Sequence, residues 1–87
     1  MYYVYILLSK KDNQFYTGFT EDLRRRVAEH NKGKVQSTAA RRPLQLVYYE
    51  GSIDQKDAIH REKYLKTTYG KQYLRNRIKN YLLKAAR

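Results

Sequence analysis

YTGFTEDLRRRVAEH, the stretch from Tyr16 to His30, decides how the rest of the chain is interpreted. It opens with a short apolar segment and continues into one whose apolar residues recur at helical spacing, so a strand that leads directly into a helix is predicted. The same stretch carries three side-chain types that transfer a proton or bind a phosphate, namely tyrosine, arginine and histidine. This combination points to phosphodiester chemistry.

The predicted helix begins after Thr20, a suitable N-cap, with Glu21 and Asp22 in the first turn, where acids favour the positive end of a helix. It is expected to end near Asn31, because Gly33 is a good residue for the C-terminal cap.

On this helix Leu23 and Val27 form the buried stripe, and Arg26 and His30 lie beside it on one flank. Arg26 therefore borders the core, where a guanidinium needs a partner to offset the loss of water. A phosphate is one such partner, and a salt bridge with Glu62 is the structural alternative. The neighbouring Arg24 and Arg25 are predicted to point to solvent. They form either a solvated face or general contacts with phosphate.

Upstream, Tyr2–Ser9 is rich in β-branched and aromatic residues and predicts a central strand. The segment Lys10–Gln14 contains Asp12 and Asn13, which tolerate turn conformations, so this strand should form an antiparallel hairpin with Phe15–Phe19.

A register that places Tyr5 near Tyr16 or Gly18 projects both tyrosines to one face, and a slip of one residue would separate them. Gly18, which has no side chain, would leave open space beside Tyr16 for a ligand. The alternative is an ordinary packing glycine.

Downstream, Lys34–Pro43 is predicted to be a mobile loop that faces the substrate, because basic loops near a site clamp a phosphate backbone. A plain connector is the alternative. Leu44–Glu50 predicts a third strand, Gln55–Thr67 a helix capped by Asp54 or Ser52, and Lys71–Lys84 a further helix after a break at Gly70. The expected fold is α+β, a three-stranded antiparallel sheet flanked by helices in the order β-β-α-β-α-α, as one domain over residues 1–87.

Glu62 is an acid on the buried stripe of the second helix, which it shares with Ala58, Ile59 and Leu65. A carboxylate in this position indicates either a salt bridge or a metal ion.

The composition favours a nucleic-acid partner. Nineteen Lys and Arg residues against eight Asp and Glu residues give a net charge of +11, and a merely basic protein is the alternative. Residues 60–87 hold nine basic residues and one acidic residue, so they contribute +8 of this charge. The 87 residues leave room for one domain, in which a large cofactor pocket is not expected.

The absence of cysteine excludes a disulfide scaffold, thiol catalysis and a Cys-ligated zinc site. The N-terminus lacks the features of a signal peptide, and no run approaches the roughly 20 apolar residues of a membrane span. We therefore expect a cytoplasmic protein without a membrane partner.

The chain resembles the GIY-YIG nuclease superfamily, specifically its small single-domain bacterial members. The first half of the motif is matched by Tyr3–Tyr5, in which tyrosine replaces the glycine, and the second by Tyr16–Gly18, in which threonine replaces isoleucine. The resemblance continues through Arg26 and His30 and ends with Glu62. Each tripeptide alone is a weak signal, whereas the order and spacing of the whole set are specific.

The resemblance implies metal-dependent hydrolysis of a phosphodiester bond in DNA. Tyr16 would be the general base, directly or through water, and Tyr5 would position the nucleophile. Arg26 would bind the scissile phosphate, and Glu62 would be the lone protein ligand of Mg²⁺ or Mn²⁺. His30 would orient the tyrosines or share proton transfer with them.

The catalytic asparagine of the family is matched best by Asn76, fourteen residues after Glu62. On a regular helix Asn76 would face solvent, and Asn80 lies nearer the apolar flank. Further basic residues are predicted to contact the nucleic-acid backbone: Arg24, Arg25, Lys32, Lys34, Arg41, Arg42, Lys66 and Lys71.

The leading hypothesis is therefore an endonuclease for damaged or branched DNA, in repair or recombination, which a partner protein would direct to its target. One alternative is a non-catalytic DNA- or RNA-binding module with the same fold. A ribosome-associated or architectural basic protein is the other.

Overall fold

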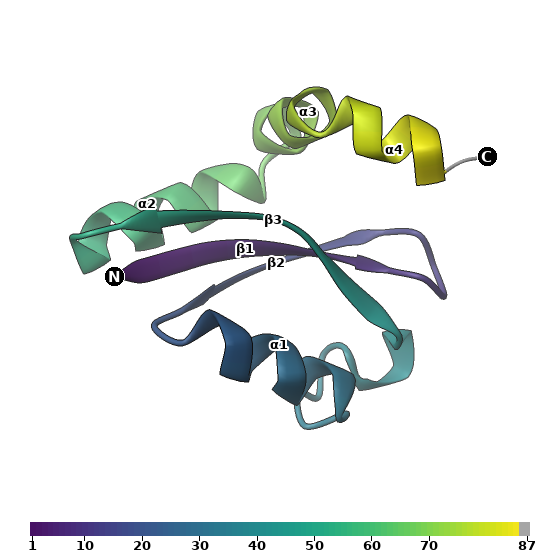
Figure 1. Cartoon of the computed structure of the whole chain (residues 1–87). Coiled ribbons are helices and arrows are strands. Elements are labelled where there is room, and N and C mark those ends of the chain that lie inside the picture. Colours follow the sequence, from purple (N-terminus) through teal and green to yellow (C-terminus); the bar gives the residue numbers. More distant parts are fainter. Residues whose placement is uncertain (86–87) are drawn as a thin grey trace.

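A three-stranded antiparallel sheet separates one helix on one face from three helices on the other (Figure 1). The computed structural model describes residues 1–85. In chain order the elements are β1 (Tyr2–Ser9), β2 (Phe15–Thr20), α1 (Leu23–Asn31), the 3₁₀ helix η1 (Ala39–Arg41), β3 (Leu44–Ser52), α2 (Gln55–Leu65), α3 (Thr68–Arg77) and α4 (Lys79–Ala85). The predicted α+β class and the three antiparallel strands are confirmed.

β1 is the central strand, in the order β2-β1-β3, as its composition predicts. Tyr5 pairs with Gly18 of β2 and, on its other side, with Tyr49 of β3. Because side chains alternate along a strand, Tyr16 lies on the same face of the sheet as Gly18 and therefore as Tyr5. The hairpin turn contains Asn13 at a φ of 59°, which agrees with its prediction as a turn residue.

Each face of β1 is buried under different helices. Val4 and Ile6 pack against α2 and α3, and Tyr5 and Leu7 face α1. The first cluster is completed by Ala58, Leu65 and Leu74, and the second by Leu44 with partly buried Tyr16, Leu23, Val27 and Leu46. Burial of such side chains contributes about 1.5 to 3 kcal/mol each, so both faces stabilise the fold.

The start of α1 differs from the prediction. Asp22, not Thr20, is the N-cap, and its side chain accepts a hydrogen bond from the N–H of Arg25 at 3.2 Å. Thr20 still belongs to β2, where it pairs with Tyr3, so the helix cannot begin directly after it. The predicted end is confirmed, with Asn31 as the last helical residue and Gly33 at a φ of 77°.

The prediction that Gly70 breaks the helical pattern is wrong. Gly70 lies in the first turn of α3, and its N–H donates to the N-cap Thr67 at 3.1 Å. A Cβ at this position would overlap the carbonyl oxygen of Tyr64 and approach the backbone of Leu65. The glycine therefore allows α3 to begin directly against the end of α2.

The last predicted helix, Lys71–Lys84, is two helices, because α3 ends at Arg77 and α4 begins at Lys79. The observed order is thus β-β-α-β-α-α-α. No helix within residues 1–85 is both long and apolar enough to cross a membrane.

The close approach of Gly70 to the backbone of Tyr64 and Leu65 leads to a prediction about stability. Gly70→Ala should lower the free energy of unfolding by about 1 to 3 kcal/mol, the usual cost of forcing an extra methyl group into a packed contact. Chemical denaturation measures the change. Gly51→Ala is the matched control, because its Cβ would meet the end of the flexible Met1 side chain. Equal stability of the two variants would contradict the proposed contact.

Candidate active site

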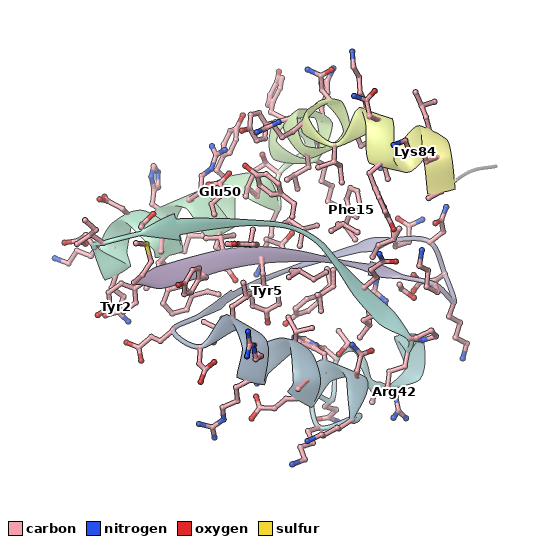
Figure 2. The ribbon with its side chains drawn as sticks, viewed as in Figure 1. Tyr2, Tyr5, Phe15, Arg42, Glu50 and Lys84 are labelled. Atoms are coloured by element: carbon pink, nitrogen blue, oxygen red, sulfur yellow. The ribbon has the colours of Figure 1, made fainter. Side chains whose placement is uncertain are left out.

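Three rings from three different elements meet on the α1 face of the sheet. Tyr5 comes from β1, Tyr16 from β2 and His30 from the last turn of α1. The ring centroids are 6.3 Å apart for the two tyrosines, 5.6 Å for Tyr5 and His30, and 4.9 Å for Tyr16 and His30. Figure 2 shows Tyr5 between β1 and α1. The structure therefore brings these three predicted site residues together.

Gly18 does not leave the open space beside Tyr16 that the sequence predicted. A Cβ on Gly18 would overlap the Cζ and hydroxyl oxygen of Tyr5. The space above the glycine is therefore filled by the Tyr5 ring, and the packing alternative is the correct one. Gly18 lets the Tyr5 hydroxyl reach across β2 toward the neighbouring groups.

Burial controls the protonation of this cluster. Tyr5 and His30 are fully buried, and the Tyr5 hydroxyl lies 2.8 Å from Nε2 of His30. Desolvation raises the pKa of Tyr5 to about 12, although the Arg26 guanidinium acts in the opposite direction. Burial, followed by the charge of Arg26, lowers the pKa of His30. At neutral pH the phenol therefore keeps its proton and the imidazole is uncharged.

Thr38 is a member of the cluster that sequence reasoning missed. Its side chain is fully buried, and its Oγ1 lies 2.7 Å from Nδ1 of His30. The only sequence signal was a hydroxyl residue among small residues in a loop, which does not distinguish a buried hydrogen-bond partner from a solvated one.

Arg26 has an ion-pair partner other than the predicted one. Its Nη1 lies 3.2 Å from Oε1 of Glu29, and Nε of Arg25 lies 3.4 Å from the other oxygen of the same carboxylate. The proposed salt bridge between Arg26 and Glu62 is therefore wrong. A partner three residues away on the same helix is more easily reached.

A hollow of about 320 Å³ is lined by Arg25, Arg26 and Glu29 together with the end of β2. The proximity of Tyr5 raises the pKa of Arg26, desolvation opposes this increase, and the hydrogen bond to Glu29 raises the pKa further. The arginine thus connects this hollow with the tyrosine cluster. A guanidinium in such a position is suited to bind a phosphate oxygen.

Glu62 on α2 is mostly buried, with its side chain 19% exposed, and Oε2 lies 3.2 Å from Nζ of Lys66. Its charge is near enough to Tyr5 to raise the pKa of that phenol further. The salt-bridge alternative is therefore present, with Lys66 as the partner.

The carboxylate of Glu62 is also a suitable ligand for Mg²⁺. Residues 1–85 contain no group of three or more His, Cys, Asp or Glu side chains that could hold a metal ion. Mg²⁺, however, is commonly held by one or two carboxylates and completes its coordination with water and substrate phosphate. Glu62 fits this pattern.

The predicted backbone contacts are mostly accessible. Seven of them are exposed, namely Arg24, Arg25, Lys32, Lys34, Arg42, Lys66 and Lys71. Asn76 on α3 and Asn80 on α4 are also exposed.

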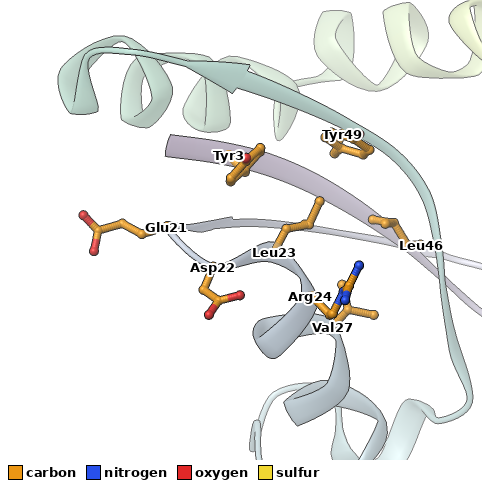
Figure 3. Close-up of a pocket in the computed structure, with 8 residues that line it drawn as sticks. All are labelled: Tyr3, Glu21, Asp22, Leu23, Arg24, Val27, Leu46 and Tyr49. Carbon is orange, nitrogen blue, oxygen red and sulfur yellow. The ribbon is translucent and has the colours of Figure 1, made fainter. Parts of the chain in front are cut away.

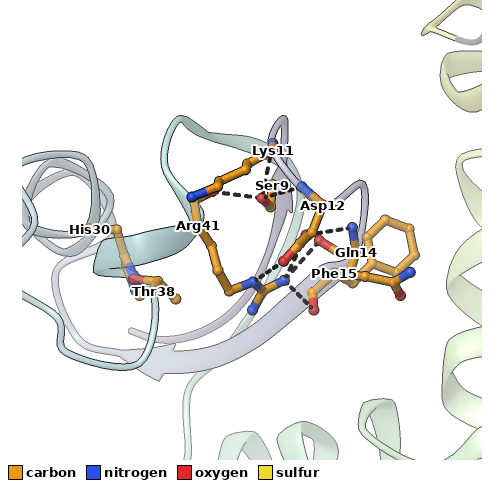
Figure 4. A network of polar contacts seen from close by, with 8 residues as sticks. All are labelled: Ser9, Lys11, Asp12, Gln14, Phe15, His30, Thr38 and Arg41. Atoms are coloured by element: carbon orange, nitrogen blue, oxygen red, sulfur yellow. Dashed lines mark hydrogen bonds and ion pairs between the residues drawn. The ribbon is translucent and has the colours of Figure 1, made fainter.

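Arg41 is instead held by the protein. Its Nε lies 2.7 Å from a carboxylate oxygen of Asp12, and its Nη2 donates to the carbonyl of Gln14 at 3.1 Å (Figure 4). The hydrogen bond from Arg41 lowers the pKa of Asp12 to about 2. In addition, Ser9 Oγ donates to the Arg41 carbonyl at 2.6 Å. With Thr38 also bound to His30, the loop is anchored rather than the mobile clamp that the sequence suggested.

A hollow of larger volume lies elsewhere. It has a volume of about 600 Å³ between α1 and β3 (Figure 3). Its lining is Tyr3, Glu21, Asp22, Leu23, Arg24, Val27, Leu46 and Tyr49. Neither Tyr5, Tyr16 nor His30 contributes to it, and two acids stand at its edge. We therefore place the candidate site at the tyrosine cluster rather than in this hollow.

The sequence of this chain is similar to those of known proteins. Residues 1–76 match the family model of the GIY-YIG catalytic domain. A UPF0213 protein from Lacticaseibacillus paracasei is 46% identical over 66 residues, which cover 75% of this chain and 73% of that protein. A UPF0213 protein from Staphylococcus haemolyticus is 43% identical over 75 residues and covers 85% and 90% of the two chains.

A solved structure is also similar. The solution NMR structure of a UPF0213 protein from Bacillus halodurans has a TM-score of 0.53 and 36% sequence identity. The match covers 85% of this chain and 82% of that one.

The burial of His30 leads to a prediction about how stability depends on pH. Its folded-state pKa lies below the ordinary value of 6.5, so the unfolded chain takes up the proton first. The stability that neutral His30 contributes is present above about pH 6.5 and is lost as the pH falls toward the lower folded-state value. Thermal unfolding measured from pH 7.5 to pH 5 should show this loss.

His30→Gln should flatten this part of the stability profile. The matched control is His60→Gln, since His60 is exposed. If His30→Gln keeps the slope of the unaltered protein, His30 is not the group that titrates.

Proposed function

Because the chain belongs to the GIY-YIG catalytic-domain family, we propose that it is a divalent-metal-dependent endonuclease that hydrolyses a phosphodiester bond in DNA. The observation that supports this best is the cluster of Tyr5, Tyr16 and His30 beside Arg26, with the charge of Glu62 acting on the same phenol. Tyr5, Tyr16, Arg26 and His30 come from β1, β2 and α1, and Glu62 comes from α2.

The chemistry requires stabilisation of negative charge. Attack on a phosphodiester builds charge on the phosphate oxygens, and a positioned guanidinium is suited to bind them. In our proposal Arg26 releases Glu29 and holds the scissile phosphate. Tyr16 then accepts a proton from the attacking water, directly or through a second water, and passes its own hydroxyl proton to solvent, while Tyr5 orients the nucleophile. As the water oxygen bonds to phosphorus, the bond from phosphorus to the leaving oxygen breaks, and that oxygen takes a proton from solvent.

Glu62 would hold Mg²⁺ or Mn²⁺ through its carboxylate. When bound, the ion would supply further stabilisation of the charge that develops on the phosphate. Lys66 would then lose its partner, and its exposed ammonium group would be free to contact the DNA backbone.

The exposed basic residues would bind DNA without reading its sequence, because phosphate contacts position a duplex but do not specify bases. Specificity would then come from the shape of damaged or branched DNA in repair or recombination, or from a partner protein. Asn76 keeps its proposed role as the asparagine of the family motif.

A non-catalytic DNA- or RNA-binding module is the second candidate. It is favoured by one observation, the pairing of Glu62 with Lys66, since this ion pair is sufficient to explain an acid in a basic region.

Cleavage with a metal ion separates the two candidates. The unaltered protein should cut supercoiled or branched DNA when Mg²⁺ or Mn²⁺ is added, and EDTA should abolish the activity. Glu62→Gln should reduce the rate by about 100-fold or more, because it removes the charged ligand at similar side-chain volume. Agarose and denaturing gels measure the products. The control is Asp57→Asn, which removes an exposed acid from the same helix.

Three outcomes are informative. Loss of cleavage in Glu62→Gln alone supports the endonuclease. Salt-sensitive DNA binding without cleavage by any protein supports the binding module. Equal cleavage by both variants and the unaltered protein contradicts the assignment of Glu62.

A second prediction concerns binding. Glu29→Gln should tighten DNA binding about twofold to tenfold at low salt, because it releases Arg25 and Arg26 together, and the gain should shrink as salt rises. Fluorescence anisotropy with a short duplex measures the affinity. The control is Glu21→Gln, which makes the same change in net charge in the same hollow. The carboxylate of Glu21 does not pair with Arg25 or Arg26, which both pair with Glu29. Equal gains for the two variants would show that net charge alone is responsible.

A further inference from the structure

A row of hydrogen bonds connects Tyr5 on β1 with the loop after α1. The Tyr5 hydroxyl lies 2.8 Å from Nε2 of His30. The other ring nitrogen, Nδ1, lies 2.7 Å from Thr38 Oγ1. Thr38 in turn contacts the carbonyl oxygen of Val35 at 3.4 Å. The direction of these hydrogen bonds determines which groups face a substrate as donors.

The Thr38 end of the row defines a direction. The Thr38 hydroxyl donates its single proton to the carbonyl oxygen of Val35, so Oγ1 meets His30 with a lone pair. Nδ1 of His30 is therefore the donor in the hydrogen bond to Thr38.

The Tyr5 end agrees with this direction. A neutral imidazole with its proton on Nδ1 has a lone pair on Nε2, and this lone pair accepts the proton of the Tyr5 hydroxyl. Every donor in the row therefore has an acceptor, as buried polar groups require.

The opposite tautomer would break this pattern. With the proton on Nε2, the Tyr5 oxygen would accept from His30, and the phenol proton would lose its acceptor. An unpaired buried donor is unfavourable. The phenol would then turn its proton toward the substrate.

We propose that Thr38 is a positioning residue that holds His30 in the Nδ1-protonated tautomer and thereby keeps the Tyr5 oxygen available as an acceptor for the attacking water. The role rests on the proposed nuclease function. An oxygen that accepts from the water directs the water lone pair toward phosphorus, whereas a hydroxyl that donates to it engages that lone pair. Thr38 thus affects the reaction through two intervening side chains, without contact with the DNA.

The first test is spectroscopic and does not depend on activity. Nitrogen-15 NMR of labelled histidine distinguishes the two neutral tautomers by the shifts of the ring nitrogens. The unaltered protein and Thr38→Ser should show His30 protonated on Nδ1. Thr38→Val, which keeps the volume and removes the hydroxyl, should shift His30 toward the Nε2-protonated form. Circular dichroism checks that both variants are folded.

The second test is kinetic. With DNA and Mg²⁺, Thr38→Val should lower kcat by about tenfold or more with little change in DNA affinity, because a misplaced tautomer affects the reaction rather than binding. Thr38→Ser should retain most of the rate. A purely structural role would instead lower stability in Thr38→Val and leave the tautomer and kcat of the folded protein unchanged.

Two results overturn the proposal. One is a His30 protonated on Nε2 in the unaltered protein, and the other is a folded Thr38→Val that keeps the Nδ1-protonated form. If no protein cleaves DNA, the proposed nuclease function fails, and the NMR measurement still decides whether Thr38 selects the tautomer.

Discussion

The hydrogen bond between the Tyr5 hydroxyl and His30 joins the central strand to α1, and the arrangement of the site depends on it. α1 has nine residues, and a helix of this length is not stable alone in water. Its apolar contacts come mainly from Leu23 and Val27, both only partly buried. The buried ring of His30 therefore supplies an essential part of the docking of α1. Arg26, one turn earlier, is positioned by the same contact.

The two faces of β1 contribute differently to the structure. On one face Val4 and Ile6 pack with Ala58, Leu65 and Leu74, an apolar cluster that is fully or almost fully buried. On the other face the buried groups include a phenol and an imidazole, which are costly to remove from water unless each is hydrogen-bonded. The apolar face supplies stability that a small chain needs, and the opposite face can then hold polar groups at a site.

Alternation along the strands was sufficient to predict the sheet and the meeting of the two tyrosines. Tyr5 and Tyr16 lie on one face because both strands follow the period of two and the turn at Asn13 sets the register. The errors arose where tertiary contacts decide. Gly70 suggested a break by its propensity, yet the close approach of Tyr64 requires a glycine inside the helix. Thr38 could not be found, since its importance comes from the position of a ring eight residues away.

The charges of the proposed site are paired within the protein in a way that is easily reversed. Arg26 pairs with Glu29, and Glu62 pairs with Lys66, each along one helix. Such partly exposed pairs contribute little to stability, because water solvates the separated charges well. A phosphate or a divalent ion competes with them through stronger, more highly charged contacts. Local pairing thus limits repulsion in a chain of net charge +11 and leaves its binding groups available to a substrate.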